Sequence, residues 1–386
     1  MLASKTIRNA SLVMLFTGLC ASSASVILPL LQEHYNLSYD FSGFLLALLS
    51  AGNLAAALLC GFLPRFLGVR QTVLLLSLGT MLGYILMVVS GCKLFLGLGF
   101  LLIGFGKGTS LNNATVAAGS KAADRTGVVN LLNALFAAGS LLAPFLYLVS
   151  RKISFWQLPL LLLAIGGGLT WLLFCAMHLE SKPSIARRDS NTDFLKDRHF
   201  WYSAGFLFGQ QCAEISVTGW LVTYFKDQGI LTGIFSQLTV TVIWSAMLIG
   251  RLLLAFVLPA ASRFRSLTLM SVASLVTYLL MLMSSDGLPA LITLFLFGLS
   301  ISGAYPTVIA TANRSMSNAS VGVLLPVGGI GAILMPYITG AVAEQAGIRG
   351  GMLCSAAALV IMIVFSVLMK RCESDSDAEK SLSHEL

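Results

Sequence analysis

Three charged residues, Lys107, Glu214 and Arg251, lie inside long apolar stretches of this sequence. Glu214 lies midway along Phe200–Phe225, a stretch long and apolar enough to cross a bilayer as a helix. A charged group at the centre of a membrane costs about 2.5–3.5 kcal/mol on insertion scales, so it normally faces a polar interior or a solute pathway. Because a low dielectric favours the neutral form of a carboxyl group, Glu214 can bind a proton, a solute hydroxyl, or both in turn. The alternative is a structural acid held by a fixed partner.

Lys107 and Glu214 are expected at similar depths. With a rise of 1.5 Å per residue, they lie about 16 Å and about 21 Å from the same end of their helices. One hypothesis is an ion pair across a central cavity, broken by a proton or a solute. A second is that Lys107 binds the carboxylate or phosphate of an anionic substrate, and a third is a neutral lysine facing helix carbonyls. Arg251 lies about 10 Å from that end, where it can reach toward Glu214, close a gate or extend to the interface.

Amide and aromatic side chains, which suit the hydroxyls and ring faces of sugars, accompany these charges. Gln210 and Gln211 precede Glu214 by four and three residues and can share its helix face. Asn130 and Asn133 are three residues apart and can share a face of another helix. An aromatic residue in a membrane helix more often packs or lies in the interfacial belt than stacks on a ligand. The remaining candidates for the pathway are Asn112, Asn113, Trp220 and Tyr305.

Composition predicts the elements that carry these residues. The 386 residues are 57% hydrophobic and only 10% charged, whereas a soluble domain carries roughly 25% charged residues. About 20 apolar residues span the hydrocarbon core as a helix. Twelve segments of this kind are expected: Asn9–Leu31, Ser42–Pro64, Arg70–Ser90, Leu94–Ala118, Gly127–Val149, Phe155–His178, Phe200–Phe225, Ser236–Leu258, Arg265–Ser284, Leu288–Ala312, Val321–Ala343 and Gly347–Lys370.

The longest polar stretch, Glu180–His199, has six of these segments before it and six after it. This organisation is typical of a transporter built from two related halves. We expect an all-α membrane protein with an N-terminal six-helix bundle at 1–178 and a linker at 179–199. A C-terminal six-helix bundle follows at 200–370, and the polar tail at 371–386 is expected to be disordered.

The net charge is +8, and the distribution of the basic residues along the chain indicates the membrane topology. Lysine and arginine are concentrated in alternate connections, including Arg65–Arg70 and the central linker, and near both termini. This is the positive-inside pattern, which predicts that both termini and the linker lie in the cytoplasm and that the protein spans the plasma (inner) membrane. The expected partners are the lipid bilayer and a small-molecule substrate, with no nucleic acid, and the protein is expected to be a monomer.

Enzyme chemistry finds no support in the motifs. The four histidines (His34, His178, His199 and His384) have no metal-ligand spacing, and the seven cysteines form no CxxC pair. No glycine-rich phosphate loop occurs in the right context. We therefore expect no enzyme activity, no metal and no cofactor, with protons as the coupling ion.

Four segments carry a family resemblance: Asn130–Pro144, Ala213–Tyr224, Met247–Arg251 and Gly298–Pro306. With the twelve-segment plan, they resemble the major facilitator superfamily and, within it, the fucose–galactose–glucose:proton symporter branch, close to bacterial glucose/mannose:proton symporters. The resemblance implies two pseudo-symmetric six-helix bundles. It also implies secondary active sugar transport by alternating access, proton-coupled symport and a bacterial origin.

Two departures keep other functions open. Arg65 stands where the superfamily loop motif has an aspartate, and the N-terminal half has no carboxylate inside its membrane segments. Proton coupling through that half is therefore not implied. The alternatives are an exporter (antiporter) of amphipathic metabolites or drugs, and a transporter of an anionic sugar derivative that uses Lys107.

Overall fold

The computed structural model describes residues 4–122, 124–177, 179, 193–257, 263–315 and 318–385, and every regular element in these ranges is helical. Most of the expected linker therefore lies outside the described residues. The first half contains α1 (Lys5–Tyr35), α2 (Tyr39–Phe62), α3 (Pro64–Leu67), α4 (Val69–Val89), α5 (Lys93–Gly119), α6 (Arg125–Leu141), α7 (Ala143–Ile153) and α8 (Leu158–Cys175). The second half contains η1 (Asp193–Lys196), α9 (Arg198–Asp227), α10 (Ile234–Val257), α11 (Arg263–Met283), α12 (Gly287–Ile301), α13 (Ala304–Ser315) and α14 (Asn318–Glu385).

Eleven of the twelve expected membrane segments are matched by described helices that are long and apolar enough to span; the exception is Phe200–Phe225 in α9, which is long enough but contains the polar residues Gln210, Gln211 and Glu214. Within the described ranges, ten helical stretches are long and apolar enough to cross a membrane. The longest of them, Val323–Cys372, bends at Gly347 (φ 75°), so it holds the last two expected segments. Helix α9 is 30 residues long and carries the polar stripe that includes Glu214. The all-α, two-bundle architecture is confirmed.

Two expected helices are each divided in two. Pro144 lies at the start of α7 and has no N–H to donate to the carbonyl of Ser140, four residues earlier. The Ser22 hydroxyl of α1 donates to that carbonyl instead, at 3.0 Å. Pro306, near the start of α13, likewise cannot donate to Ser302 in the break after α12.

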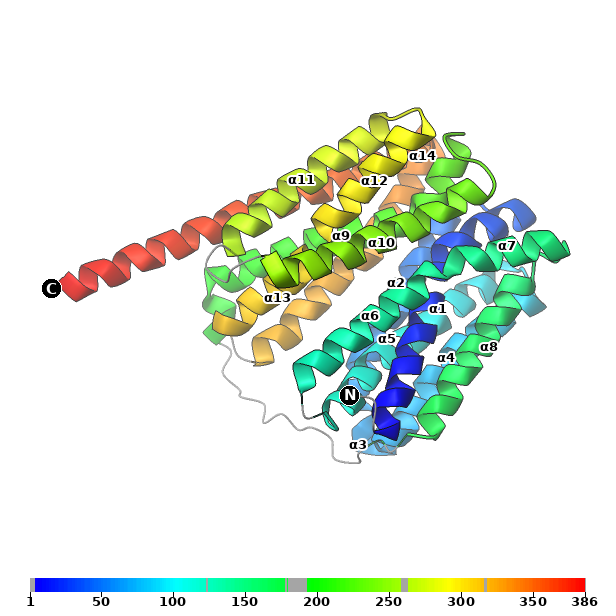
Figure 1. The fold of residues 1–386 in the computed structure, drawn as a ribbon, viewed down its shortest axis with the longest axis horizontal. Helices are drawn as coiled ribbons and strands as arrows, with labels where there is room; N and C mark the ends of the chain where they lie inside the picture. Colours follow the sequence, from blue (N-terminus) through cyan, green and yellow to red (C-terminus); the bar gives the residue numbers. More distant parts are fainter. Residues whose placement is uncertain are drawn as a thin grey trace.

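The C-terminal segment differs from expectation. Disorder is expected for 371–386, but the structure continues α14 as a helix through Glu385, projecting away from the bundles (Figure 1). The segment contains alanine, leucine, glutamate and lysine, which all have high helix propensity. The polar composition of this segment is therefore compatible with a helix, although it does not allow the segment to form a packed core.

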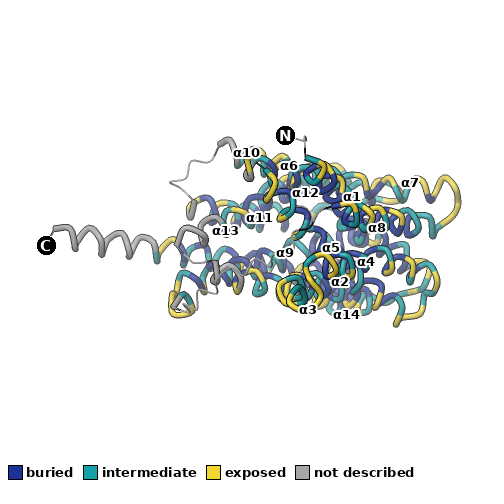
Figure 2. Tube along the Cα trace, turned by 90° about the horizontal axis from the view of Figure 1, so that it is seen from below, coloured by how far each residue is buried: buried dark blue, intermediate teal, exposed yellow. Residues whose placement is uncertain are grey.

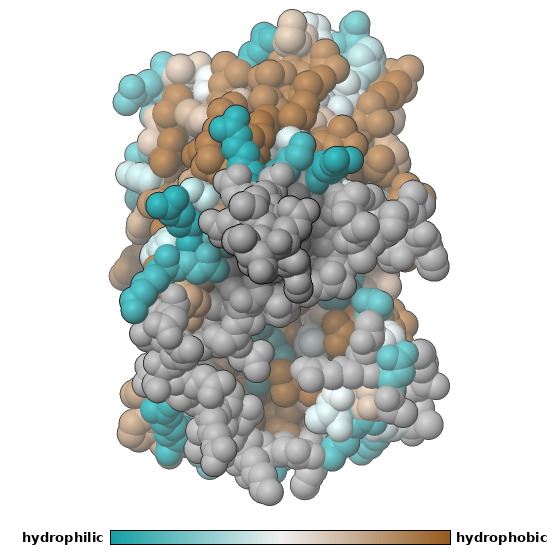
Figure 3. Space-filling view, turned by 90° about the vertical axis from the view of Figure 1, so that its left-hand side faces the viewer, coloured by the Kyte–Doolittle hydropathy of each residue, from teal (hydrophilic) through white to brown (hydrophobic). Residues whose placement is uncertain are grey.

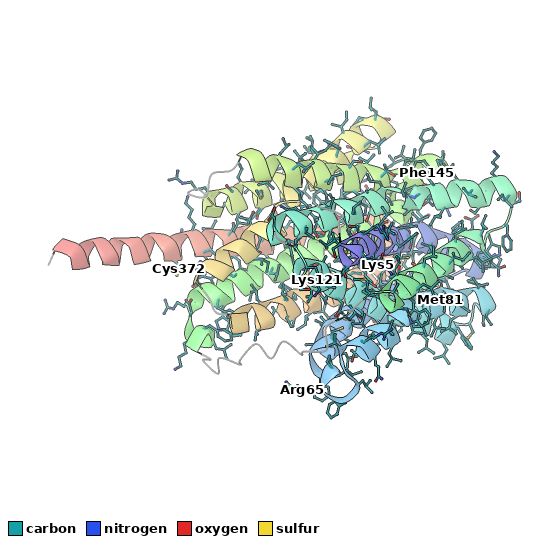
Figure 4. The ribbon with its side chains drawn as sticks, turned by 60° about the horizontal axis from the view of Figure 1, so that its bottom comes forward. Lys5, Arg65, Met81, Lys121, Phe145 and Cys372 are labelled. Carbon is teal, nitrogen blue, oxygen red and sulfur yellow. The ribbon has the colours of Figure 1, made fainter. Side chains whose placement is uncertain are left out.

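The two bundles form a V (Figure 1). They separate toward the end at which the chain passes from one bundle to the other, which we call the linker end, and they meet at the opposite end, which we call the far end. Lys5, Arg65 and Lys121 lie toward the linker end, whereas Phe145 lies on the outer side of α7 (Figure 4). Exposed positions follow the outer sides of the helices, among them α3 and α7 (Figure 2). Many of them are large apolar side chains, as a lipid-facing surface requires.

Polar contacts between the halves close the far end. Helices α1 and α9 run side by side there. The Thr223 hydroxyl donates to Gln32 Oε1 at 3.1 Å, and Lys226 pairs with Glu33 at 3.0 Å. Tyr39, the first residue of α2, donates its backbone N–H to Glu344 Oε2 at 2.7 Å and its hydroxyl to an oxygen of Asp227 at 2.8 Å. Tyr39, a residue of the first half, is therefore hydrogen-bonded to two helices of the second half, α9 and α14.

Glycine allows the backbones of α2 and α14 to touch at this end. A Cβ atom added to Gly43 would lie 2.7 Å from the carbonyl oxygen of Pro336, and one added to Gly340 would collide with the carbonyl oxygen of Tyr39. Both obstacles are backbone atoms, which cannot move without shifting a helix. The closed far end therefore depends on glycine at both positions.

We predict that Gly340→Val destabilises the protein by about 1–3 kcal/mol, the usual cost of overpacking. The added side chain must push α2 and α14 apart and weaken the contacts of Tyr39. Thermal unfolding of the purified protein in detergent measures the effect. Gly61→Val is the matched control, because nothing lies within 4 Å of a Cβ atom at Gly61. Equal melting temperatures for the two variants would show that the far end is not packed as described.

Candidate functional site

Glu214 belongs to a polar stripe along α9. Gln210 Nε2 donates a hydrogen bond to Glu214 Oε2. The Thr218 hydroxyl donates to the backbone carbonyl of Glu214 at 2.7 Å, and the backbone carbonyl of Thr218 accepts a hydrogen bond from Ser25 of α1. The shared face expected for Gln210 and Glu214 is confirmed. The carboxyl group thus lies one turn from a contact between the two halves.

Two cations from different bundles act on this carboxyl group. Glu214 interacts electrostatically with Arg251 of α10 and, more weakly, with Lys107 of α5. Among the described residues the ion pair within 4.0 Å is that of Lys226 and Glu33, so neither cation touches Glu214. The hypothesised Lys107–Glu214 pair is therefore a through-space interaction in this conformation. Tyr305 of α13 is mostly buried and interacts with both Glu214 and Arg251.

Two buried polar atoms near Glu214 have no partner in the described protein. They are Oε1 of Gln210, whose side chain is fully buried, and Nε of Arg251. Buried polar groups are nearly always hydrogen-bonded, so an unpaired acceptor and donor at one site call for a ligand or water. The cluster of Lys107, Gln210, Glu214, Arg251 and Tyr305 is called the central cluster below.

The other two candidates on α9 pack against α14. Gln211 is half-buried, and its Cγ would lie 3.3 Å from a Cβ atom added to Gly328. Trp220 is fully buried, and its indole N–H donates to the carbonyl oxygen of Pro336 at 3.0 Å. Six residues separate Trp220 from Glu214, which places them about 120° apart around the helix. Trp220 therefore lies in the helix interface, away from the central cluster, and does not offer a face for stacking on a sugar.

The four asparagines lie closer to the linker end. Asn113 Nδ2 donates to the carbonyl of Thr109 at 2.9 Å and contacts Cys60 Sγ of α2 at 3.4 Å. The other three, Asn112, Asn130 and Asn133, are exposed.

Asn130 precedes Leu141 by eleven residues, about three turns, so both lie on one face of α6. The Thr241 hydroxyl of α10 donates to the carbonyl of Leu141 at 3.2 Å. Because the bundles separate toward the linker end, Asn130 and Asn133 lie where α6 and α10 part. Figure 3 looks at this end and shows hydrophilic side chains among the apolar ones that it draws in colour.

Sequence reasoning missed Asn53 of α2, which lies beside α5 next to Lys107. A Cβ atom added to Gly108 would lie 3.0 Å from Asn53 Oδ1. The half-buried Asn53 is an amide residue in an apolar helix, the residue type that also selected Asn112 and Asn113. It lies at the contact of α2 with α5, one residue along α5 from Lys107.

Residues 10–325 match the family model described as Major Facilitator Superfamily. The chain is also similar to a yeast protein, Bypass of stop codon protein 6 of Saccharomyces cerevisiae. The two are 23% identical over 382 residues, which cover 86% of this chain and 76% of that protein.

Solved structures share the fold at low sequence identity. A mutant of the nucleoside transporter NupG is 13% identical with a TM-score of 0.76, covering 95% of this chain and all (100%) of that one. A D-xylose-proton symporter is 13% identical with a TM-score of 0.74, covering 95% and 96%. A bacterial homologue of the human lysosomal transporter Spinster, in an inward-facing and unoccupied conformation, is 13% identical with a TM-score of 0.72 and the same coverage as the symporter.

We predict that Gln210→Met destabilises the protein by about 1–3 kcal/mol, because Glu214 loses its side-chain hydrogen-bond donor while remaining buried. Gln237→Met in α10 is the matched control. Gln237 is 2% exposed and also has an unpaired Oε1 atom, but it does not donate to Glu214 as Gln210 does. Thermal unfolding in detergent compares the two variants, and an equal loss in both would contradict a specific role of Gln210.

Proposed function

Because this multi-pass membrane protein belongs to the Major Facilitator Superfamily, we propose that it is a secondary active transporter of a small polar solute of the sugar class. Transport proceeds by alternating access and is coupled to protons at Glu214. The observation that carries the proposal is the place of this carboxyl group, midway along α9 and within electrostatic range of cations from both bundles.

Proton coupling needs one group whose protonation alters the contacts between the halves. When Glu214 is ionised, it attracts Arg251 from its own half and Lys107 from the other half. Protonation removes that attraction, and the neutral carboxyl group can donate a hydrogen bond to a solute oxygen. The proton and the solute therefore both bind at Glu214, so that binding of one affects binding of the other. Coupled transport requires at least such a shared residue.

The V-shaped arrangement supports alternating access. The positive-inside pattern assigns the linker end to the cytoplasm, so the bundles are open inward, as in the inward-facing Spinster homologue. The contacts that close the far end are individually weak. An exposed ion pair contributes about 0.2–1 kcal/mol and a hydrogen bond about 0.5–1.5 kcal/mol. Solute binding is able to offset these polar contacts, and the packing of α2 on α14 through Gly43 and Gly340 must part as well when the far end opens.

The polar groups around Glu214 suit a polyhydroxylated solute. Gln210 supplies an amide, and Tyr305 supplies a hydroxyl beside the carboxyl group. Two structural neighbours are described as transporters of xylose and of nucleosides, which are both rich in hydroxyls. We place the protein in the inner membrane of a bacterium as a monomer, with both termini in the cytoplasm.

The test is uptake of labelled hexoses by proteoliposomes with an imposed proton gradient. We predict that the wild-type protein accumulates solute only with the gradient. Glu214→Gln keeps exchange of solute across the membrane but loses accumulation at least tenfold, because an amide mimics the protonated acid and cannot release a proton.

Glu33→Gln is the control for this experiment. It makes the same chemical change at an exposed acid of the far end, where it removes one weak ion pair. We expect accumulation within about twofold of the wild type, since exposed pairs contribute little. Gradient-driven accumulation by Glu214→Gln at the wild-type level would refute proton coupling at this residue.

A further inference from the structure

The central cluster carries more positive than negative charge. Leaving out the part of α14 after Met369, which projects from the bundles, three Asp, Glu, Lys or Arg residues of the described helices lie more than one turn from a helix end or from the bend at Gly347. They are Lys107, Glu214 and Arg251. Two of them are basic and one is acidic, so the buried interior has one cation without a matching carboxylate.

Lys107 is the unmatched cation. Arginine stays charged in proteins, and Glu214 interacts more strongly with Arg251 than with Lys107. Arg251 is therefore the main electrostatic partner of the ionised Glu214. Lys107 is half-buried, and it makes neither a hydrogen bond nor an ion pair with any described residue. Lys107 Nζ is not among the buried atoms without a partner, so this ammonium group can be reached by a small molecule, and a charge partly removed from water is stabilised by an opposite charge.

Lys107 is placed to meet a molecule that enters from the linker end. It follows Phe100 by seven residues and Ile103 by four, so the three lie on one face of α5. Phe100 and Ile103 are buried in the apolar interior of the first bundle, together with Ile27 and Leu49. Lys107 is the first polar group on this face on the linker side of that interior.

We propose that the transported solute carries a negative charge, a carboxylate or a phosphate, and that Lys107 binds this group. The proposal rests on the proposed function and narrows its substrate class from sugars in general to their acidic derivatives. The two unpaired atoms of the cluster fit the rest of such a molecule. Arg251 Nε is a second donor for the anionic group, and Gln210 Oε1 is an acceptor for a hydroxyl.

Binding of three probes that share one ring tests this inference: glucose, glucuronate and glucose 6-phosphate. The purified full-length protein is titrated with each, and affinity is followed by the rise in melting temperature. We expect the wild-type protein to bind one of the anions at least tenfold more tightly than glucose. Comparison of glucuronate with glucose 6-phosphate shows whether the site accepts a carboxylate or a phosphate.

Variants of Lys107 separate a binding role from a structural one. Lys107→Met should weaken binding of the anion at least tenfold and leave glucose binding within twofold, whereas Lys107→Arg should keep the preference for the anion. Lys107→Met without ligand should melt no lower than the wild type, because it removes an uncompensated charge. Lys93→Met is the control, since Lys93 starts the same helix about 21 Å away and lies over the ring of Phe41.

Tighter binding of glucose than of either anion would overturn this inference and leave the proposed sugar transport standing. The same holds if Lys107→Met binds the anion as well as Lys93→Met does. Binding of none of the three probes, together with no hexose uptake by proteoliposomes, would refute the proposed function and with it the substrate class inferred here.

Discussion

The interior of this protein is organised by charges that attract one another without touching. Glu214 lies between Arg251 of its own half and Lys107 of the other, and neither cation comes within 4.0 Å of an acid in the described structure. A contact pair in this medium would be strong and slow to break. An interaction between charges more than 4.0 Å apart weakens or strengthens whenever a proton, a solute or a helix moves. Both proposals above follow from this separation.

At the far end the two bundles are in direct contact. These contacts must be strong enough to exclude solute and weak enough to break when the end opens. The apolar packing of α2 on α14 through Gly43 and Gly340 gives close contact over a short length. The polar contacts around it, such as that of Tyr39 with Glu344, lie at the surface, where water replaces a broken hydrogen bond. Opening this end therefore exposes polar groups that water can solvate, together with apolar side chains such as Leu46, which packs against Gly219 of the other half.

Much of the fold could be predicted from the sequence, because membrane helices are selected by length and apolarity alone. The helix rise also predicted that Lys107 and Glu214 lie at similar depths in the membrane, and therefore that their charges can interact. Trp220 could not be assigned, because α9 is buried on most of its circumference and its sequence does not show which side meets α14. Asn53 and the breaks at Pro144 and Pro306 depend on neighbouring helices that a single sequence does not identify.

The contrast between contacts within and between bundles explains how the halves can move as rigid bodies. In the first bundle, Cβ atoms added to Gly18 of α1 or Gly139 of α6 would collide with backbone carbonyls of the partner helix. Ser22 and Ser140 add hydrogen bonds across the same contact, at 3.0 and 3.1 Å. Between the bundles at the same depth, α1 meets α9 through the hydroxyl of Ser25 and through a small apolar cluster that includes Val26 and Val222. A motion that separates the halves breaks this hydrogen bond beside Glu214 and parts the glycine contact of α2 with α14 at the far end, whereas a motion within the first bundle must undo the contact of α1 with α6. The site thus lies at a weak contact in the middle of the molecule, where a bound solute has most effect on which end is open.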